Sequence, residues 1–215
     1  MRDSGIAVNT KETYFEYGGI EIEWLKSRDP VLGAAIDEIG HIYRPVIPDL
    51  FAAMVSSVVG QQISSKAHTT VWNRILERFN PLTPKTIGSA APEELQTCGI
   101  SMRKTLCIKE IAKSIVEGSL DPQQLHDLPD DEVCKKLTQI KGIGTWTAEM
   151  LMIFSMQRMD ILSWGDLAIQ RGMRILYRHR KITTKLFNKY KRRYSPYSSV
   201  ASLYLWAISV KDPGR

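Results

Sequence analysis

The sequence has 215 residues, of which 43% are hydrophobic and 24% charged, and its net charge is +6. This length and composition suit one domain, or two small lobes that share a cleft, around a hydrophobic core of ordinary size. The basic balance suits a polyanionic partner but does not identify one, because many basic proteins bind no nucleic acid.

The cysteines and histidines do not indicate a disulfide framework or a metal centre. Cys98, Cys107 and Cys134 are odd in number and lack paired spacing, which favours a reducing compartment. A four-cysteine cluster for iron and sulfur is absent, and none of the four histidines stands at metal-ligand spacing from another His or Cys. We therefore expect no bound metal.

The sequence also predicts where the protein resides. The N-terminus lacks a basic start followed by an apolar run, so a signal peptide is not expected. Apolar runs long enough to span a bilayer are absent. We expect an intracellular protein that contacts no membrane, in the cytoplasm and nucleoid of a bacterium or in the nucleus of a eukaryote.

The first half of the chain shows helix-start signals separated by short connections. Residues 1–29 are expected to form a short strand-like arm or an extension packed on the core. Asp29-Pro30 then supplies a cap and a first-turn proline for a helix. Residues 50–59 are apolar on nearly all sides, which indicates a central helix. Gly60–Ser64 interrupts this helix before another long one.

The second half repeats these signals and leads to the prediction of fold class. Alternating apolar and polar residues, the pattern of a strand, are not convincing beyond the arm. The fold class is therefore predicted to be all-α, with many short helices in a domain spanning residues 30–215. The later helices are expected at about 102–116, 131–140, 144–157, 166–177, 183–194 and 199–210.

A turn containing two glycines joins the helices on either side of residues 140–145. Gly142 and Gly144 allow positive φ and a close approach of the backbone to a ligand. The first N–H groups of the following helix have no partner inside that helix. Such a turn binds an anion, and a backbone phosphate is the natural candidate.

Asp166 is the candidate residue for chemistry. It follows Trp164-Gly165 at the predicted start of a helix, where an aspartate is often only a cap. The preceding segment, residues 159–165, is too apolar for a simple exposed loop. An ionised carboxylate in a partly apolar cleft can stabilise an oxocarbenium-like sugar cation or activate a water beside one.

Two further groups of side chains have both a structural and a functional interpretation. Gln61 and Gln62 lie between two central helices, either as a polar loop tip or as a wedge that fills the gap left by an extruded base. Large aromatic residues are most often core residues, but flat faces also stack on a flipped base. The aromatic candidates for such a base pocket are Trp146, Trp164, Tyr204 and Trp206.

Four sequence segments, in this order, resemble the helix-hairpin-helix DNA glycosylase superfamily, and within it the 3-methyladenine DNA glycosylase II branch. The resemblance covers residues of about 30–210. The segments are Val59-Gly-Gln-Gln-Ile-Ser64, Ile140-Lys-Gly-Ile-Gly-Thr-Trp-Thr-Ala148, Trp164-Gly-Asp166 with Arg171 after it, and Tyr194-Ser-Pro-Tyr-Ser-Ser-Val-Ala-Ser-Leu-Tyr-Leu-Trp206.

The resemblance implies two helical lobes around a DNA-binding cleft, and a monomeric enzyme that flips an alkylated purine from duplex DNA and hydrolyses its glycosidic bond. Asp166 falls on the catalytic aspartate of the family, and Gln62 falls near the intercalating wedge, with Gln61 beside it. Trp146 and Trp206 match positions that line the base pocket. The DNA backbone would be bound by Lys141, Gly142, Ile143, Gly144, Thr145 and Arg171, and relatives can hold a monovalent cation at this hairpin.

One departure from the wider family narrows the expected chemistry. Relatives that also cleave the strand carry a lysine nucleophile after the Gly-x-Gly-Thr of the hairpin, where this chain has Trp146. Without that lysine a Schiff base cannot form there, so strand cleavage is not expected. Two alternatives remain open: a glycosylase of the same fold for uracil, mismatched or oxidised bases, and a non-catalytic helix-hairpin-helix DNA-binding protein.

Overall fold

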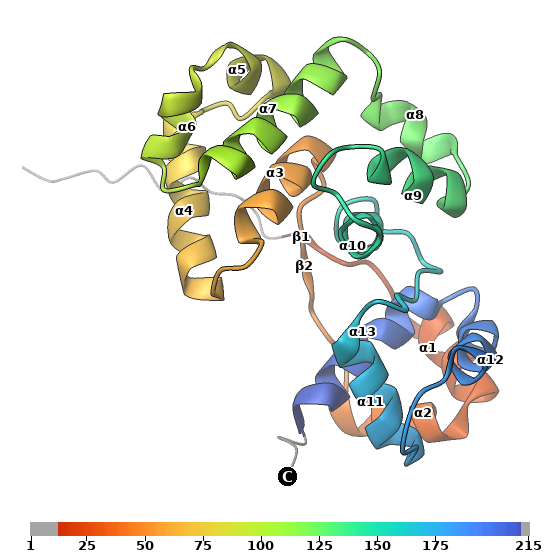
Figure 1. The fold of residues 1–215 in the computed structure, drawn as a ribbon. Helices are drawn as coiled ribbons and strands as arrows, with labels where there is room; N and C mark the ends of the chain where they lie inside the picture. The colour runs from red at the N-terminus through yellow and green to blue at the C-terminus, as the bar shows by residue number, and fades with distance from the viewer. Residues whose placement is uncertain (1–12, 212–215) are drawn as a thin grey trace, which may run out of the picture.

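The computed structural model describes residues 13–211, which form helices and one small sheet (Figure 1). The sheet pairs β1 (Thr13–Tyr14) antiparallel with β2 (Pro45–Val46). The all-α prediction is confirmed, with this sheet as a minor addition. The helices are α1 (Gly19–Arg28), α2 (Pro30–Ile39), α3 (Leu50–Gly60), α4 (Ser65–Arg78), α5 (Pro84–Ser89), α6 (Pro92–Thr97), α7 (Met102–Val116), α8 (Pro122–Asp127), α9 (Asp130–Thr138), α10 (Thr145–Phe154), α11 (Leu167–Tyr177), α12 (Thr184–Tyr194) and α13 (Ser198–Lys211).

The helices separate into two lobes (Figure 1). Lobe A contains α1, α2, α11, α12 and α13, and lobe B contains α3 to α10. The first two helices and the last three therefore form lobe A, and lobe B is one continuous insertion between them. Two segments join the lobes: β2 leads into α3, and residues 155–166 lead from α10 to α11.

Side-chain caps fix the starts of several helices, including the start that the sequence predicts at Asp29. Asp29 accepts hydrogen bonds from the first N–H groups of α2, and Asp49 accepts one at the start of α3. Ser101 and Asp121 do the same for α7 and α8. These caps satisfy N–H groups that have no partner inside the helix.

The helical body begins earlier than the sequence predicts. The expected arm of residues 1–29 contains α1, which packs against α2 in lobe A. Apolar residues alternate with glutamates in Gly19–Trp24, a pattern typical of a strand. The helix forms instead because Glu21 closes its first turn on a backbone N–H and Leu25 is completely buried. Residues 1–12 lie outside the described residues.

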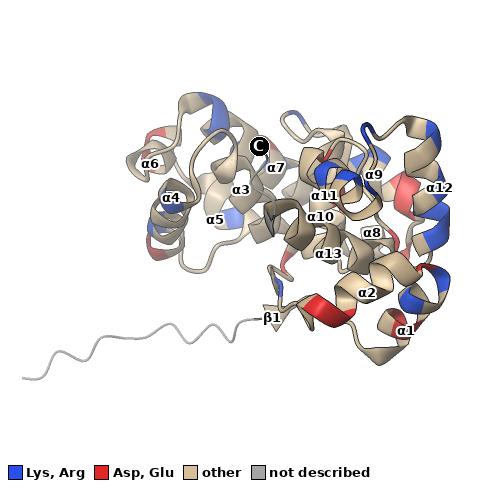
Figure 2. Cartoon of the chain, turned by 90° about the horizontal axis from the view of Figure 1, so that it is seen from below, with Lys and Arg blue, Asp and Glu red and all other residues tan. Residues whose placement is uncertain are grey.

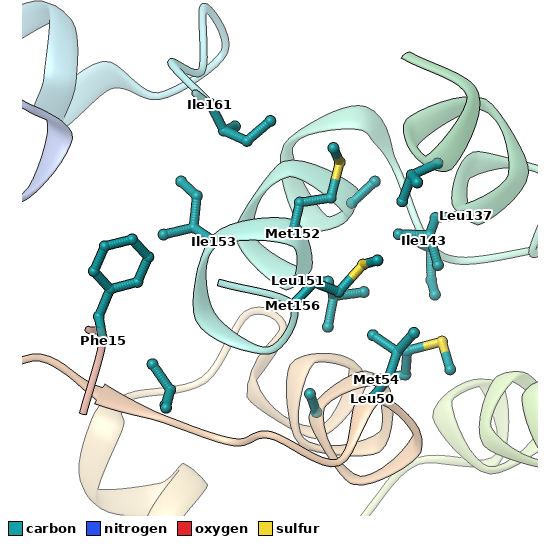
Figure 3. Packing of buried hydrophobic residues seen from close by; sticks show 14 of the residues in the cluster. Phe15, Leu50, Met54, Leu137, Ile143, Leu151, Met152, Ile153, Met156 and Ile161 are labelled. Carbon is teal, nitrogen blue, oxygen red and sulfur yellow. The ribbon is translucent and has the colours of Figure 1, made fainter. Parts of the chain in front are cut away.

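The hydrophobic core runs through both lobes and holds them together. Figure 3 shows its central part, where Leu50 and Met54 of α3 lie among buried side chains of α9 and α10. Two contacts of Phe154 extend across the seam between the lobes. Its carbonyl accepts from the N–H of Ile47 at 2.9 Å, and its ring centroid lies 5.4 Å from that of Trp206 on α13. The end of α10 is thus fixed against lobe A.

Two properties of the described chain bear on the exclusions drawn from the sequence. Within residues 13–211, helices of the length and apolarity needed to cross a membrane are not found. Cys98, Cys107 and Cys134 all lie in this part, and each is a free thiol.

Candidate active site

The hairpin between α9 and α10 has the turn that the glycine pattern predicts, with one difference. Gly142 has φ of +96°, whereas Gly144 has φ of −85° in the extended region, so only the first glycine needs positive φ. A Cβ on Gly144 would meet no protein atom within 4 Å. Ile143 is 3% exposed and anchors the turn in the core. Hence space beside Gly144 stays open to a ligand from outside.

The thiol of Cys107 on α7 forms a hydrogen bond with this hairpin and packs against it. Its Sγ donates to the carbonyl of Lys141 at 2.9 Å. A Cβ on Gly142 would lie 2.6 Å from the same Sγ, so packing as well as φ requires glycine there. Burial raises the pKa of the Cys107 thiol, which keeps it protonated and able to donate at neutral pH.

The turn that follows α3 is tied both to α7 and to the hairpin. Lys104 is half-buried on α7, and its Nζ donates to the carbonyls of Val59 and Gln61 at 2.8 Å each. Burial lowers the pKa of this lysine. The side chain of Gln61 donates to the carbonyl of Gly142 at 3.0 Å. Gln62 is exposed, with φ of 58°, and so projects from a turn that its neighbours fix.

Asp166 caps α11 and also faces lobe B. One carboxylate oxygen, Oδ1, accepts from the N–H groups of Ala168 and Ile169 at 2.9 Å each. The other, Oδ2, accepts from Nε1 of Trp146 at 2.9 Å. Asp166 is 7% exposed. The cap predicted from sequence is therefore present, and it uses one oxygen, which leaves the second for a group in the other lobe.

The bond between Trp146 and Asp166 joins the hairpin to the candidate catalytic group. Trp146 is the second residue of α10 and remains 49% exposed. Its Cβ would lie 3.9 Å from a Cβ on Gly165, so the indole packs along the loop that precedes Asp166. Trp146 thus connects α10 of lobe B to the start of α11 in lobe A.

A second carboxyl group lies in the same place and was not predicted from the sequence. Glu149 is on α10, one turn after Trp146, and accepts a short hydrogen bond from Oγ of Ser163, which is fully buried. Burial raises the pKa of Glu149, and the negative charge of Asp166 adds to this. The spacing of Trp146 and Glu149 places them on one helix face, which is the only signal that the sequence offers.

The other predicted pocket residues fall in different environments. Trp164 is 41% exposed and rests edge-on against Phe187 of α12, with ring centroids 5.0 Å apart. Trp206 is half-buried at the seam between the lobes. Tyr204 is completely buried, and its hydroxyl lies 3.3 Å from that of Tyr17. The assignment of Tyr204 to a base pocket is therefore wrong, because a bound base cannot reach a fully buried ring.

The basic candidates are accessible. Lys141 in the hairpin and Arg171, on the second turn of α11, are both exposed. Lys141 directly precedes Gly142, and Arg171 lies five residues after Asp166. Both are therefore available to a polyanionic ligand.

Comparison with known proteins gives a consistent result. The model of the family described as HhH-GPD superfamily base excision DNA repair protein matches residues 55–196. DNA-3-methyladenine glycosylase 1 of Schizosaccharomyces pombe is 37% identical over 164 residues, which cover 74% of this chain and 72% of that protein.

Solved structures agree in fold over nearly the whole chain. The crystal structure of a DNA-3-methyladenine glycosidase from Bacillus halodurans has a TM-score of 0.82 and 35% identity, and covers 92% of this chain and 93% of that one. The S. pombe 3-methyladenine DNA glycosylase in complex with abasic DNA has a TM-score of 0.74 and 33% identity, and covers 87% of this chain and 95% of that one. The chain belongs to the HhH-GPD superfamily of base excision DNA repair proteins.

Proposed function

We propose that this protein is a monofunctional DNA glycosylase that removes alkylated purines of the 3-methyladenine type from duplex DNA. The observation that carries the proposal is Asp166, a carboxylate held at the N-terminus of α11 and bonded to the indole of Trp146 from the other lobe. The names of the similar proteins support the substrate class. We also propose that the enzyme acts on DNA as a monomer.

The reaction breaks the bond between sugar C1′ and the purine nitrogen and joins a water oxygen to C1′. Alkylation gives the purine a positive charge, and the electrons of the broken bond neutralise it as the base leaves. The leaving group therefore needs little help from an acid. What remains is to stabilise the growing sugar cation and to accept a proton from water, and a carboxylate serves both purposes.

The two oxygens of Asp166 have different roles: one caps α11, and the other is available for the reaction. Oδ1 uses its lone pairs for two backbone N–H groups of α11. Oδ2 accepts from Trp146 only, among the bonds identified for it, and keeps one lone pair for the sugar or for water. The cap fixes the carboxylate, and Oδ2 carries the chemistry.

Aromatic faces beside Asp166 suit a cationic base. Trp146 and Trp164 are both about half exposed; Trp146 bonds to Asp166, and Trp164 lies two residues before it in the chain. A ring face attracts a positively charged base by cation–π interaction, beyond ordinary stacking. This attraction favours alkylated purines over neutral bases such as uracil.

Trp146 stands where strand-cleaving relatives carry a lysine, which favours hydrolysis without strand cleavage. Trp146 carries no amine that can form a Schiff base with the sugar, and its Nε1–H donates to Asp166. The product is then an intact strand with an abasic site. A borohydride-trappable adduct between wild-type protein and abasic DNA would contradict this.

The hairpin and the turn after α3 are proposed to grip the DNA. Residues 141–145 would bind a strand phosphate through the free N–H groups of α10, with Arg171 contacting the backbone nearby. The carbonyls of Lys141 and Gly142 each accept one protein hydrogen bond, from Cys107 and Gln61, and each keeps a lone pair that suits a monovalent cation. Phosphate binding requires only the N–H groups at the start of α10 and does not depend on this cation.

Gln62 is the proposed wedge, and Gln61 positions it. The side chain of Gln61 is engaged with Gly142, and its carbonyl is held by Lys104. Gln62 is exposed at φ of 58°, which is an unfavourable backbone state for a residue other than glycine. Strain of this kind is typical of functional sites, and it directs one glutamine toward the duplex.

The test compares release of bases from methylated and uracil-containing duplexes by the wild type and by Asp166→Asn. We expect methylated purines to be released by the wild type and at least 100-fold more slowly by the variant. Release of uracil instead would favour the alternative glycosylase. Binding of DNA without release of any base, or equal rates for the two proteins, would contradict the proposed mechanism.

A further inference from the structure

We infer that Glu149 is a positioning residue, which holds the loop carrying Asp166 by accepting a hydrogen bond from Ser163. The inference rests on the proposed function and adds to it a residue outside the motifs that define the site. The segment Ser163–Asp166 forms the aspartate loop.

One face of α10 holds the aspartate loop at both of its ends. Trp146 bonds to Asp166, the last residue of the loop, through Nε1. Glu149 lies one helical turn further on and bonds to Ser163, the first residue of the loop, through Oε2. Residues three apart on a helix project from the same face, so the two grips act from a single rigid surface.

These two bonds cross from lobe B to the lobe that contains α11. Two other contacts of the loop stay within lobe A: the side chain of Gln170 donates to the carbonyl of Trp164 at 2.7 Å, and the Trp164 ring rests on Phe187. The position of Asp166 relative to the hairpin is therefore set by Trp146 and Glu149. Because the hairpin is the proposed DNA grip, this relation decides whether the carboxylate meets the sugar.

The carboxyl group of Glu149 accepts a hydrogen bond from Ser163. It forms no salt bridge with any of the described residues. It is half-buried on α10, and burial is the main cause of its raised pKa. The groups that act on it are Asp166, Lys191 from α12 and, on α9, the thiol of Cys134. Ser163 is completely buried and so has no water to replace this acceptor.

The expected effect is on geometry and not on DNA affinity. Ser163 is completely buried and Glu149 carries a carboxyl group, so neither is suited to bind a phosphate. Loss of the bond frees the loop to shift, and a shift of about 1 Å at a reacting group lowers a rate by up to about 100-fold. The rate of base release should therefore fall while the affinity for DNA stays the same.

The experiment uses a matched pair of substitutions in the full chain. Glu149→Gln keeps an acceptor oxygen of the same reach, and Glu149→Met keeps the shape without an acceptor. We expect Glu149→Met and Ser163→Ala to slow single-turnover release of methylated purine by roughly tenfold or more, and Glu149→Gln to stay within about threefold of wild type. Glu132→Met, at an exposed position of α9, is the control and should match wild type.

A second readout does not depend on activity. The amides of Ala168 and Ile169 donate to Asp166 Oδ1, so their hydrogen exchange reports whether Asp166 keeps its orientation. Exchange should be faster in Glu149→Met and Ser163→Ala, and unchanged in Glu149→Gln.

Three outcomes separate the proposals. Wild-type rates and exchange in Glu149→Met and Ser163→Ala, or equal loss in Glu149→Gln and Glu149→Met, would overturn the positioning role. Release of no methylated base by the wild type would instead overturn the proposed function, and hydrogen exchange would still decide the role of Glu149. Slower release with unchanged affinity and rescue by Gln supports both.

Discussion

At the scale of single residues, Asp166 combines a cap and a candidate catalytic group, and substitution can separate them. Asparagine keeps an oxygen that accepts from the N–H groups of α11 but has no charge, whereas alanine removes both functions. With that oxygen on α11, the asparagine NH2 group faces Nε1–H of Trp146, so Asp166→Asn should lose base release and the bond from Trp146 but keep the cap. Asp166→Ala should lose the cap as well, at a further cost of about 1 kcal/mol of stability. Thermal unfolding and single-turnover assays check this. Equal melting of the two variants would show that the cap contributes little.

A substitution at Gln62 should also affect stability and activity differently. Glycine adopts a φ of 58° without strain, so Gln62→Gly should keep or slightly raise the melting temperature. The same variant lacks the side chain that fills the base stack, so kcat/KM on methylated duplex should fall roughly tenfold. Gln61→Ala is the matched control: it loses the bond to Gly142 and should lose stability of about 1 kcal/mol. If Gln61→Ala alone impaired flipping, the wedge assignment would be reversed.

The raised pKa of Glu149 predicts a pH-dependent stability. The folded protein retains the proton of Glu149 over a pH range in which the unfolded chain has released it. The contribution of this group to the free energy of unfolding therefore falls as pH rises through that range, and glutamine removes the effect. Relative to wild type, Glu149→Gln should be more stable at about pH 8 than at about pH 4. A difference in melting temperature that does not change with pH would contradict this.

At the scale of elements, the hairpin is held by one glycine and one thiol. Gly142→Ala has two costs, a positive φ that alanine disfavours and a Cβ only 2.6 Å from Sγ of Cys107. We expect a loss of about 1–3 kcal/mol from urea unfolding. Adding Cys107→Ala should recover the steric part but leave the backbone part, which a double-mutant cycle measures. Full recovery would mean that φ contributes nothing.

Capping residues in the local sequence indicate where most helices start, but the local sequence of α1 predicts the wrong structure. Asp29, Asp49, Ser101 and Asp121 marked helix starts because a cap acts within three residues of itself. In α1 the alternation of apolar residues and glutamates favours a strand, and only packing of Leu25 against the rest of lobe A decides for a helix. That information lies outside the local sequence.

The candidate site shows the same division. The hairpin and Asp166 were found because their own sequence carries a signal, a pair of glycines and a cap followed by an apolar helix. The supports of the site have partners far away in the chain, such as Lys104 with Gln61 and Ser163 with Glu149. Tyr204 was assigned wrongly for the same reason, because its burial against Tyr17 depends on contacts between distant segments.

At the scale of the whole molecule, positive charge is concentrated after the candidate catalytic residue. Asp and Glu do not occur between residues 167 and 211, although both are frequent before them. In Figure 2 the basic residues of this region gather on α11 and α12 of lobe A. Since the basic residues of this region outnumber the net charge of +6, the remainder of the chain is net acidic, and an anionic duplex should orient toward lobe A. The basic residues concerned are Arg171, Arg174, Arg178, Arg180, Lys181, Lys185, Lys189, Lys191, Arg192, Arg193 and Lys211.

This distribution predicts which charges contribute to DNA binding. Arg171 and Arg174 are exposed on α11, the helix whose first turn is capped by Asp166. If both contact phosphates, replacing them with glutamine should reduce the slope of log affinity against log salt by roughly 0.9 for each residue. Lys113→Gln, on α7 of lobe B, should leave the slope unchanged, because that lysine faces Glu117 at 3.9 Å. Base release at saturating protein should not change, since these contacts position the duplex and do not touch the glycosidic bond. Equal slopes for the α11 variant and wild type would show that the duplex avoids this face of lobe A.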